Sequence, residues 1–350
     1  METKRWNIKE MNDKIESVID QAAGLLKSGE TVAFPTETVY GLGADATNNA
    51  AVEKIFRAKG RPTDNPLIAH VASKEQLKSL VSDLSPMVER LIDAFTPGPI
   101  TFVLPSNGAC ATNVTANQPT IGVRIPSHPI ALRLLRACAI PIAAPSANLS
   151  GKPSPTSADH VWNDLNGRIA GLLDDGDTGI GVESTVVDCT GDDPVILRPG
   201  GISKELIEAE IGYVLMDAGQ PTASEKPRSP GMKYTHYAPA MPLWVIEGDA
   251  HDLQKVINKQ KNKGMRIGVM ASAGTINRLS ADRKISLGDT LPDIAAHVYK
   301  ALRSFHIDDV DMIISETFPD KGIGMAIMNR LHKASSAYVP RDRDPNDESS

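Results

Sequence analysis

Cysteine is scarce in this sequence, with three thiols among 350 residues, at Cys110, Cys138 and Cys189. They are far apart and form no CxxC pair, so neither a structural zinc site nor a disulfide framework is predicted. Reduced, widely spaced thiols fit the cytoplasm, where we expect this protein to work. The eight histidines form no HExxH or similar spacing. The sequence therefore predicts no metal held directly by side chains.

Aromatic residues and long apolar runs are also scarce. Aromatics make up 4% of the chain, which leaves little surface for stacking single-stranded bases. The formal net charge is −6, opposite in sign to that of a protein that binds nucleic acid over its whole surface. A local basic cleft stays compatible with this charge. No run approaches the ~18 apolar residues of a membrane helix, and residues 1–14 lack the apolar core of a signal peptide. We therefore expect no membrane association.

The sequence does contain two stretches in which strand-like and helix-like patterns succeed each other. A chain of this length exceeds one compact core, so we predict a catalytic domain at 1–214 and a second domain at 242–340. Strand and helix alternate in the second stretch, which indicates a small parallel, Rossmann-like α/β sheet. Residues 215–241 contain four prolines and no clear period, and we interpret them as a linker. The polar residues 341–350 predict a disordered tail.

Hydrophobic periodicity predicts individual elements. The clearest helix is Asp13–Ser28, with Gly29 where a C-terminal cap belongs. Further helices are predicted at Ala51–Ala58, Lys74–Val81, Pro86–Phe95, Pro129–Cys138, Ser203–Ile211, Asp252–Lys261, Pro292–Phe305 and Gly324–Lys333. Strands are predicted at Thr31–Phe34, Leu67–Val71, Ile100–Leu104, Thr120–Ile125, Ile169–Leu173, Thr185–Asp188, Val195–Leu197, Leu243–Ile246, Arg266–Met270 and Met312–Ser315.

The first motif with chemical content is the stretch Phe34–Gly43, FPTETVYGLG. A predicted strand runs into a loop with two hydroxyls, a carboxylate and two glycines. Such strand ends hold small ligands in α/β proteins, and Thr36 and Thr38 can both donate and accept hydrogen bonds. The spacing alone favours a simpler interpretation, a tight turn with capping hydroxyls.

The second motif is a cationic cluster, RAKGRPTDNP at 57–66, with Lys54 just before it. Cations favour helix C-termini by about 0.3–1 kcal/mol, which explains Lys54 and Arg57. Lys59 and Arg61 are expected in the Gly- and Pro-rich loop, where they are suited to clamp phosphate oxygens. No GxxxxGK[ST] sequence occurs, so a P-loop is excluded.

Three further motifs follow. Arg124 lies in the apolar predicted strand of TIGVRIP, where an arginine is rarely buried without an acidic partner. It predicts either a structural salt bridge or a bidentate clamp for a ligand carboxylate. The small residues of 143–151, AAPSANLSG, let backbone approach a ligand closely. The pair GVESTVVD at 181–188 and LRPGG at 197–201 is, taken alone, consistent with turns.

Together and in this order, the five motifs resemble the YrdC-like domain of the threonylcarbamoyl-AMP synthase family. The strings that carry the resemblance are PTETVYGLG, KGRPTDNPL, GVRIP, APSANLSG and ESTVVD…LRPGG, and it spans Ile15–Ile211. The linker SPGMKYTHYAP, followed by a small α/β domain, resembles the long two-domain members. The resemblance implies an α/β fold: a twisted mixed sheet flanked by helices, followed by a small Rossmann-like α/β domain.

The resemblance also implies a nucleotidyltransferase reaction. L-threonine, bicarbonate or CO2, and ATP would give threonylcarbamoyl-AMP and pyrophosphate. The adenylate would pass to downstream proteins that transfer the threonylcarbamoyl group to an adenosine of tRNA, and direct contact with tRNA is left open. Mg2+ would enter on the ATP phosphates with no protein ligand assigned, and the reaction needs no covalent nucleophile.

Site residues follow from the same resemblance. The residues implied around threonine are Thr36, His70, Arg124, Ala144 and Ser184, and Arg124 would take its carboxylate. The residues implied around ATP are Lys59, Arg61, Thr63, Thr120, Ser146, Asn148, Ser154 and Arg198, and Lys59 and Arg61 would act electrostatically. We hypothesise that the linker closes over the nucleotide as a lid, with Tyr234 or His236 against ATP. In the alternative, Tyr234 and Tyr237 anchor the linker to a domain surface.

Two other functions compete with synthesis of the adenylate. A YrdC-like domain could serve as an RNA-binding or ribosome-assembly module, but the acidic net charge and scarce aromatics count against it. A carbamoyltransferase of the hydrogenase-maturation kind shares a related domain, but those proteins add zinc-finger-like CxxC modules, which this sequence lacks.

Overall fold

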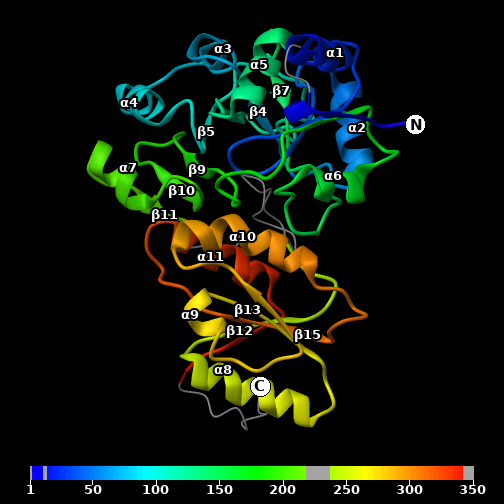
Figure 1. Cartoon of the computed structure of the whole chain (residues 1–350). Coiled ribbons are helices and arrows are strands. Elements are labelled where there is room, and N and C mark those ends of the chain that lie inside the picture. The colour runs from blue at the N-terminus through cyan, green and yellow to red at the C-terminus, as the bar shows by residue number, and fades with distance from the viewer. Residues whose placement is uncertain (1, 11–13, 218–236, 342–350) are drawn as a thin grey trace. The chain divides into compact units, whose positions relative to one another are not determined.

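The computed structural model describes residues 2–10, 14–217 and 237–341 (Figure 1). The described residues form two compact units. The first comprises 2–10, 14–150 and 154–217, and the second comprises 151–153 and 237–341.

The first unit is built on a mixed sheet of eleven strands. Across the sheet the order is β1 (Lys4–Asn7), β8 (Gly171–Asp174), β2 (Val32–Phe34), β3 (Gly41–Asp45), β7 (Ile142–Ala143), β4 (Ile68–His70), β6 (Thr120–Arg124), β5 (Ile100–Pro105), β9 (Thr185–Asp188), β10 (Val195–Arg198) and β11 (Leu215–Met216). Neighbours are parallel at β1/β8, β8/β2, β4/β6, β5/β9 and β10/β11 and antiparallel elsewhere. The mixed sheet implied by the sequence is confirmed.

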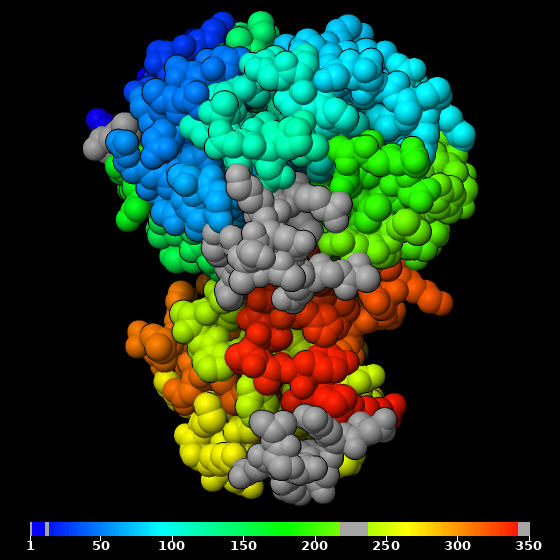
Figure 2. Space-filling view, turned by 180° about the vertical axis from the view of Figure 1, so that it is seen from behind, coloured from blue at the N-terminus to red at the C-terminus, as the bar shows by residue number. Residues whose placement is uncertain are grey.

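Seven α-helices accompany this sheet in the described part of the first unit. They are α1 (Ile15–Lys27), α2 (Asn49–Lys59), α3 (Lys74–Lys78), α4 (Pro86–Phe95), α5 (Pro129–Cys138), α6 (Ala158–Leu165) and α7 (Lys204–Ile211), and a 3-10 turn covers Ile8–Glu10. Helices α1 and α5 lie side by side, and their blue and blue-green segments meet on the surface in Figure 2. Both helices contribute to one apolar cluster, which includes Ile19, Leu26 and Leu134. Their amphipathic faces are thereby removed from water.

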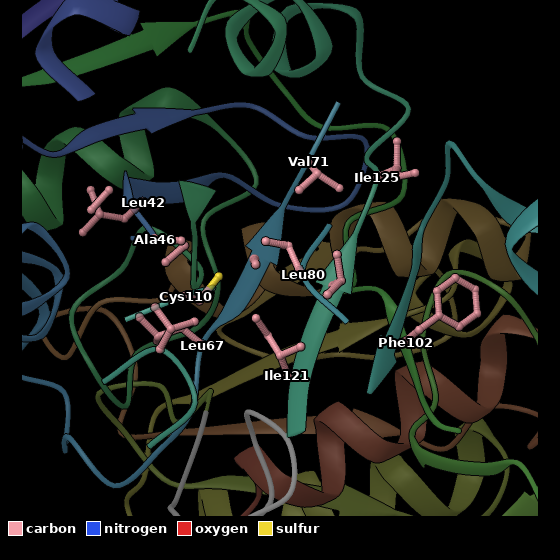
Figure 3. Packing of buried hydrophobic residues seen from close by; sticks show 14 of the residues in the cluster. Leu42, Ala46, Leu67, Val71, Leu80, Phe102, Cys110, Ile121 and Ile125 are labelled. Carbon is pink, nitrogen blue, oxygen red and sulfur yellow. The ribbon is translucent and has the colours of Figure 1, made fainter. Parts of the chain in front are cut away.

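A second and larger apolar cluster fixes the strands that carry the site residues. Leu42 of β3, Ile121 of β6 and Phe102 of β5 belong to it, together with Leu67 just before β4 (Figure 3). All four are almost completely buried, and burial of each such side chain contributes about 1.5–3 kcal/mol. The strand ends beside this cluster are therefore rigid platforms for polar side chains.

The second unit contains a sheet of five strands that are all parallel. Their order is β14 (Arg283–Ser286), β13 (Ile267–Ala271), β15 (Met312–Glu316), β12 (Leu243–Ile246) and β16 (Ala337–Val339). The helices of this unit are α8 (Ala250–Asn262), α9 (Ala273–Ile276), α10 (Leu291–Ser304) and α11 (Ile323–Ala334). Asp249 and Thr290 begin α8 and α10 with complete capping boxes. The parallel α/β arrangement predicted from the alternation is confirmed.

No helix within the described ranges is long and apolar enough to cross a membrane.

Candidate functional site

The loop after β2 is a tight turn held by threonine hydroxyls. Thr36 Oγ1 donates to the carbonyl oxygen of Val39 at 2.6 Å and accepts from the backbone N–H groups of Thr38 and Val39 at 3.2 and 3.3 Å. The hydroxyl oxygens of Thr36 and Thr38 are 2.9 Å apart, and both side chains are buried. The capped turn favoured by the spacing is present, and it fixes the position of Glu37 between the two threonines. Gly41 and Gly43 belong to β3, which corrects the expectation that both glycines lie in the loop.

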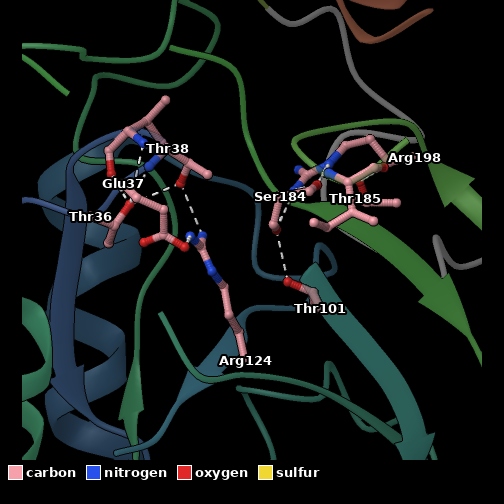
Figure 4. Close-up of polar contacts among 10 residues, drawn as sticks. Thr36, Glu37, Thr38, Thr101, Arg124, Ser184, Thr185 and Arg198 are labelled. Carbon is pink, nitrogen blue, oxygen red and sulfur yellow. Dashed lines mark hydrogen bonds and ion pairs between the residues drawn. The ribbon is translucent and has the colours of Figure 1, made fainter. Parts of the chain in front are cut away.

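Arg124 reaches this loop from the end of β6 (Figure 4). Its Nη2 donates to Glu37 Oε1 at 2.7 Å, and its Nη1 donates to Thr38 Oγ1 at 3.0 Å. Arg124 is only 4% exposed, and a buried charge needs such partners to offset its lost hydration. The salt bridge considered from the sequence is therefore formed. The contacts with Glu37 and Thr38 together use two of the five N–H donors of the guanidinium. The remaining donors still allow a carboxylate clamp.

The carboxyl group of Glu37 is held in its charged form by this arrangement. Burial on its own raises the pKa of Glu37, but the positive charge of Arg124 and its hydrogen bond outweigh burial and leave the pKa below its usual value. The site thus contains a fixed anion and a fixed cation at neutral pH.

His70 is the last residue of β4 and lies opposite Arg124 in the parallel β4/β6 pair. Its Nδ1 is 3.2 Å from the carbonyl oxygen of Ile68, and its ring packs edge-on against Phe34. Burial, and to a smaller extent the charge of Arg124, lower the pKa of His70 to about 3. The imidazole is therefore neutral, and it adds shape and one hydrogen-bonding edge to the site without adding charge.

Lys59 lies at the end of α2, which corrects the expectation that it belongs to the following loop. The helix continues to Lys59 and stops because Gly60 adopts a left-handed conformation, with φ 62°. The Lys59 ammonium is buried and donates to the carbonyl oxygens of Ser146 and Asn148 at 2.5 and 2.6 Å. Ser146 Oγ in turn donates to Asn148 Oδ1 at 2.6 Å. The structure thus brings together three residues that the sequence assigns to ATP.

Arg61 and Thr63 lie in the loop after α2. The guanidinium of Arg61 donates to the carbonyl oxygens of Asn65 and Pro66 at 3.0–3.4 Å, which closes the loop on itself. Thr63 is exposed at the loop surface.

Ser184 and Arg198 form a second polar group beside β5 (Figure 4). Arg198 Nε and Nη2 donate to the Ser184 carbonyl oxygen at 3.2 and 3.0 Å, and Ser184 Oγ lies 2.8 Å from Thr101 Oγ1. Gly200 permits this close packing, because a Cβ there would lie 2.3 Å from the Ser184 carbonyl carbon. Both arginine motifs of the sequence therefore carry buried guanidinium groups.

The remaining predicted residues lie in the same unit. Ser154 is buried and donates to Glu183 Oε1 at 2.5 Å. Thr120 is the first residue of β6. Ala144 directly follows β7, and its backbone N–H donates to the carbonyl oxygen of Ile68 at 2.9 Å. Sequence reasoning gave no role to Glu37, Thr101 or Glu183, although the expected acidic partner of Arg124 was a usable signal for Glu37.

The linker residues Tyr234 and His236 lie outside the described residues. Tyr237 is described, and it is buried in the second unit, with its ring 5.2 Å from that of Tyr299 and 5.8 Å from the Arg330 guanidinium. For Tyr237, the anchoring interpretation is therefore the one that the structure supports.

Two protein-family models match this chain. One, described as "Telomere recombination", matches residues 24–200, and the other, "Threonylcarbamoyl-AMP synthase, C-terminal domain", matches residues 202–336. A threonylcarbamoyl-AMP synthase of Bacillus subtilis (strain 168) is 52% identical over 97% of this chain and 100% of its own length. The chain belongs to the threonylcarbamoyl-AMP synthase family.

This chain also resembles a second member of the family and a solved structure. A threonylcarbamoyl-AMP synthase of Pyrococcus abyssi (strain GE5 / Orsay) is 48% identical over 91% of this chain and 94% of its own length. The crystal structure of P. abyssi Sua5 complexed with L-threonine has a TM-score of 0.89 at 44% identity, and it covers 97% of this chain and 98% of that one. The family, the α/β fold and the status of the chain as an enzyme agree with what the motifs implied.

Proposed function

We propose that this enzyme joins L-threonine, bicarbonate or CO2, and ATP into threonylcarbamoyl-AMP, with release of pyrophosphate. The observation that carries the proposal is the buried pair of Arg124 and Glu37 beside neutral His70, since such a site suits a small zwitterion. The names of the related synthases, and the threonine complex of P. abyssi Sua5, support the same substrate.

The first chemical step in this proposal is carbamate formation on the threonine nitrogen. Bicarbonate and the ammonium form of threonine give the carbamate, one water and one proton, and CO2 would give the carbamate and two protons. The protein contributes position and a polar, largely water-free environment. Arg124 holds the carboxylate of threonine, and Thr36, His70, Ala144 and Ser184 surround the rest of the molecule.

In the second step an oxygen of the carbamate attacks the α-phosphorus of ATP, and the bond to pyrophosphate breaks. Lys59, Arg61 and Arg198 neutralise the charge of the phosphates, as cations do in phosphoryl transfer generally. Thr63, Thr120, Ser146, Asn148 and Ser154 add neutral hydrogen-bonding groups around the nucleotide.

Mg2+ belongs to this proposal as an ion carried by the triphosphate, where it would offset negative charge as pyrophosphate leaves. The cations and hydroxyls of the site fit a magnesium-bound triphosphate. Within the described ranges, no group of three or more His, Cys, Asp and Glu side chains could hold a metal, so we assign the ion no protein ligand.

We further propose that the adenylate passes to proteins that transfer the threonylcarbamoyl group to tRNA. This places the enzyme in the cytoplasm, where ATP and tRNA are available. The lid remains part of the proposal as a hypothesis, with Tyr234 or His236 closing over ATP.

The decisive experiment incubates the purified chain with ATP, Mg2+, L-threonine and labelled bicarbonate. Mass spectrometry should detect an adenylate that contains threonine and the bicarbonate carbon, and no such product without threonine. Arg124→Ala should abolish most of the product. Arg90→Ala is the matched control, because Arg90 is an exposed arginine paired with Glu210 away from the site. Absence of the adenylate with the unchanged chain would refute the proposal.

A further inference from the structure

The ion pair of Glu37 and Arg124 contains two buried atoms that its own contacts do not use. Glu37 Oε2 and Arg124 Nε have no hydrogen-bond partner among the residues that the structure describes. Each unused atom belongs to the same carboxylate or guanidinium group as an atom of the 2.7 Å contact between Oε1 and Nη2, so the two lie beside one ion pair. Buried polar atoms without partners are uncommon in folded proteins, and each calls for an explanation.

This combination is specific to the site. Other side chains in the described part of the chain also have a buried atom without a partner, including Glu30, which pairs with Lys54 at 2.7 Å. Among the ion pairs of the described residues, the pair of Glu37 and Arg124 is the one in which both partners have a buried atom without a hydrogen bond. The anion has an unused acceptor, and the cation has an unused donor. A ligand that satisfies both must present a donor and an acceptor close together, and it gains most if these carry positive and negative charge.

An α-amino acid has this arrangement, because its ammonium and carboxylate groups are bonded to the same carbon. We infer that Glu37 binds the α-ammonium group of threonine through Oε2 while Arg124 binds the carboxylate, so Glu37 is a specificity-determining residue of the enzyme. The inference rests on the proposed use of threonine and adds the residue that recognises its nitrogen.

The surroundings of the pair agree with this role. Glu37 stays ionised, because Arg124 holds its pKa below the usual value despite burial, and it is thus an acceptor for an ammonium group. His70, which faces the pair from β4, is neutral and does not repel a cation. The turn of Thr36 and Thr38 fixes the backbone on either side of Glu37, so the carboxylate is positioned before threonine arrives.

A purely supporting role for Glu37 predicts something different. If Glu37 only held Arg124 in place, its loss would weaken every ligand that binds Arg124 through a carboxylate. Recognition of the ammonium group instead predicts that only ligands with that group are weakened.

The test compares two ligands with two forms of the full-length chain by calorimetry, without ATP or bicarbonate. The ligands are L-threonine and (2S,3R)-2,3-dihydroxybutanoate, which replaces the ammonium group by a hydroxyl. Glu37→Gln should weaken threonine at least tenfold and the hydroxy acid less than threefold. Glu30→Gln is the matched control, since it removes the charge of another half-buried glutamate with an unused oxygen and should change neither affinity. Equal weakening of both ligands by Glu37→Gln would overturn the inference.

A measurement on the unchanged chain keeps the inference testable if Glu37→Gln does not fold. With 15N-labelled threonine, the nitrogen resonance of the bound ligand should titrate at higher pH than that of free threonine, because a carboxylate stabilises the ammonium form. A bound nitrogen that titrates at the same or lower pH would overturn the inference.

The two proposals fail separately. If the unchanged chain makes no adenylate but Glu37→Gln weakens threonine binding tenfold and spares the hydroxy acid, the synthase reaction is wrong and the role of Glu37 stands. If the unchanged chain makes the adenylate but Glu37→Gln weakens the binding of both ligands equally, the synthase reaction stands and Glu37 only supports Arg124.

Discussion

His70 makes the stability of the first unit depend on pH in a way that a single substitution should remove. Its pKa is about 3 in the folded chain, compared with 6.5 for an ordinary histidine. The unfolded chain therefore takes up a proton near pH 6.5, whereas the folded chain does not. Because the folded pKa is the lower one, the stabilising contribution is complete above pH 6.5 and is lost progressively as the pH falls towards 3.

The expected size follows from proton linkage. Between about pH 7.5 and about pH 5, one histidine that stays neutral when folded lowers the free energy of unfolding by about 2 kcal/mol. Glu37 also has a lowered pKa, but it titrates below this window. His128 has a pKa lowered by burial, and it contributes equally to both chains in the comparison below.

The assay is urea unfolding followed by tryptophan fluorescence in a Trp244→Phe background. Trp6 and Trp162 then report the first unit alone, because Trp244 is the tryptophan of the second unit. His70→Gln retains an amide donor near the carbonyl oxygen of Ile68. The difference in stability between the two chains should shrink by about 2 kcal/mol on going from about pH 7.5 to about pH 5. A difference that does not change with pH would show that His70 is not held neutral by burial.

Three further substitutions and one substrate comparison test the rest of the site. Arg124→Lys should bind threonine at least ~10-fold more weakly in calorimetry, since a point charge lacks the guanidinium fork; normal affinity would contradict the clamp. Lys59→Met should weaken ATP binding, because the loop of Ser146 loses its ammonium partner; nucleotide titration beside a melting curve separates this from unfolding. Gly200→Ala should cost about 1–3 kcal/mol of stability in thermal melting, as its Cβ would overlap Ser184. Valine should have a kcat/KM at least ~100-fold below that of threonine, because it lacks the hydroxyl; equal values would exclude a group that reads it.

The elements best predicted from the sequence are those with a strong period or a capping signal. Helix α5 and strand β12 have the predicted bounds, and α4 begins at Pro86 after its Ser85 cap. Strands β1 and β14 were missed, because short edge strands alternate polar and apolar residues too briefly to give a period. Helix α6 is also absent from the prediction, because its eight residues make little more than two turns and are too few to establish a helical period.

The candidate site was predictable in its residue types and less so in their partners. The sequence correctly indicates a buried Arg124 that needs an acid, but it does not say which acid, because that depends on how the loop after β2 lies against the end of β6. The predicted helix stops at Ala58, one residue too early. Helix α2 includes Lys59, because the left-handed residue that ends it is Gly60. Thr101 and Glu183 are recognisable only from contacts with residues that are distant in sequence, Ser184 and Ser154 respectively.

The pairing of β1 with β8 has a consequence for how the chain is made on the ribosome. Lys4 pairs with Gly171, so the first strand to be synthesised waits for a partner that follows 167 residues later (171 minus 4). At about 5–20 residues per second, this interval lasts on the order of ten seconds or more. Throughout it, Trp6 and Ile8 lack Leu173, which joins them in the finished apolar cluster. Nascent chains that stop short of β8 should therefore expose this N-terminal segment to chaperones and proteases, whereas chains released after it should bury it.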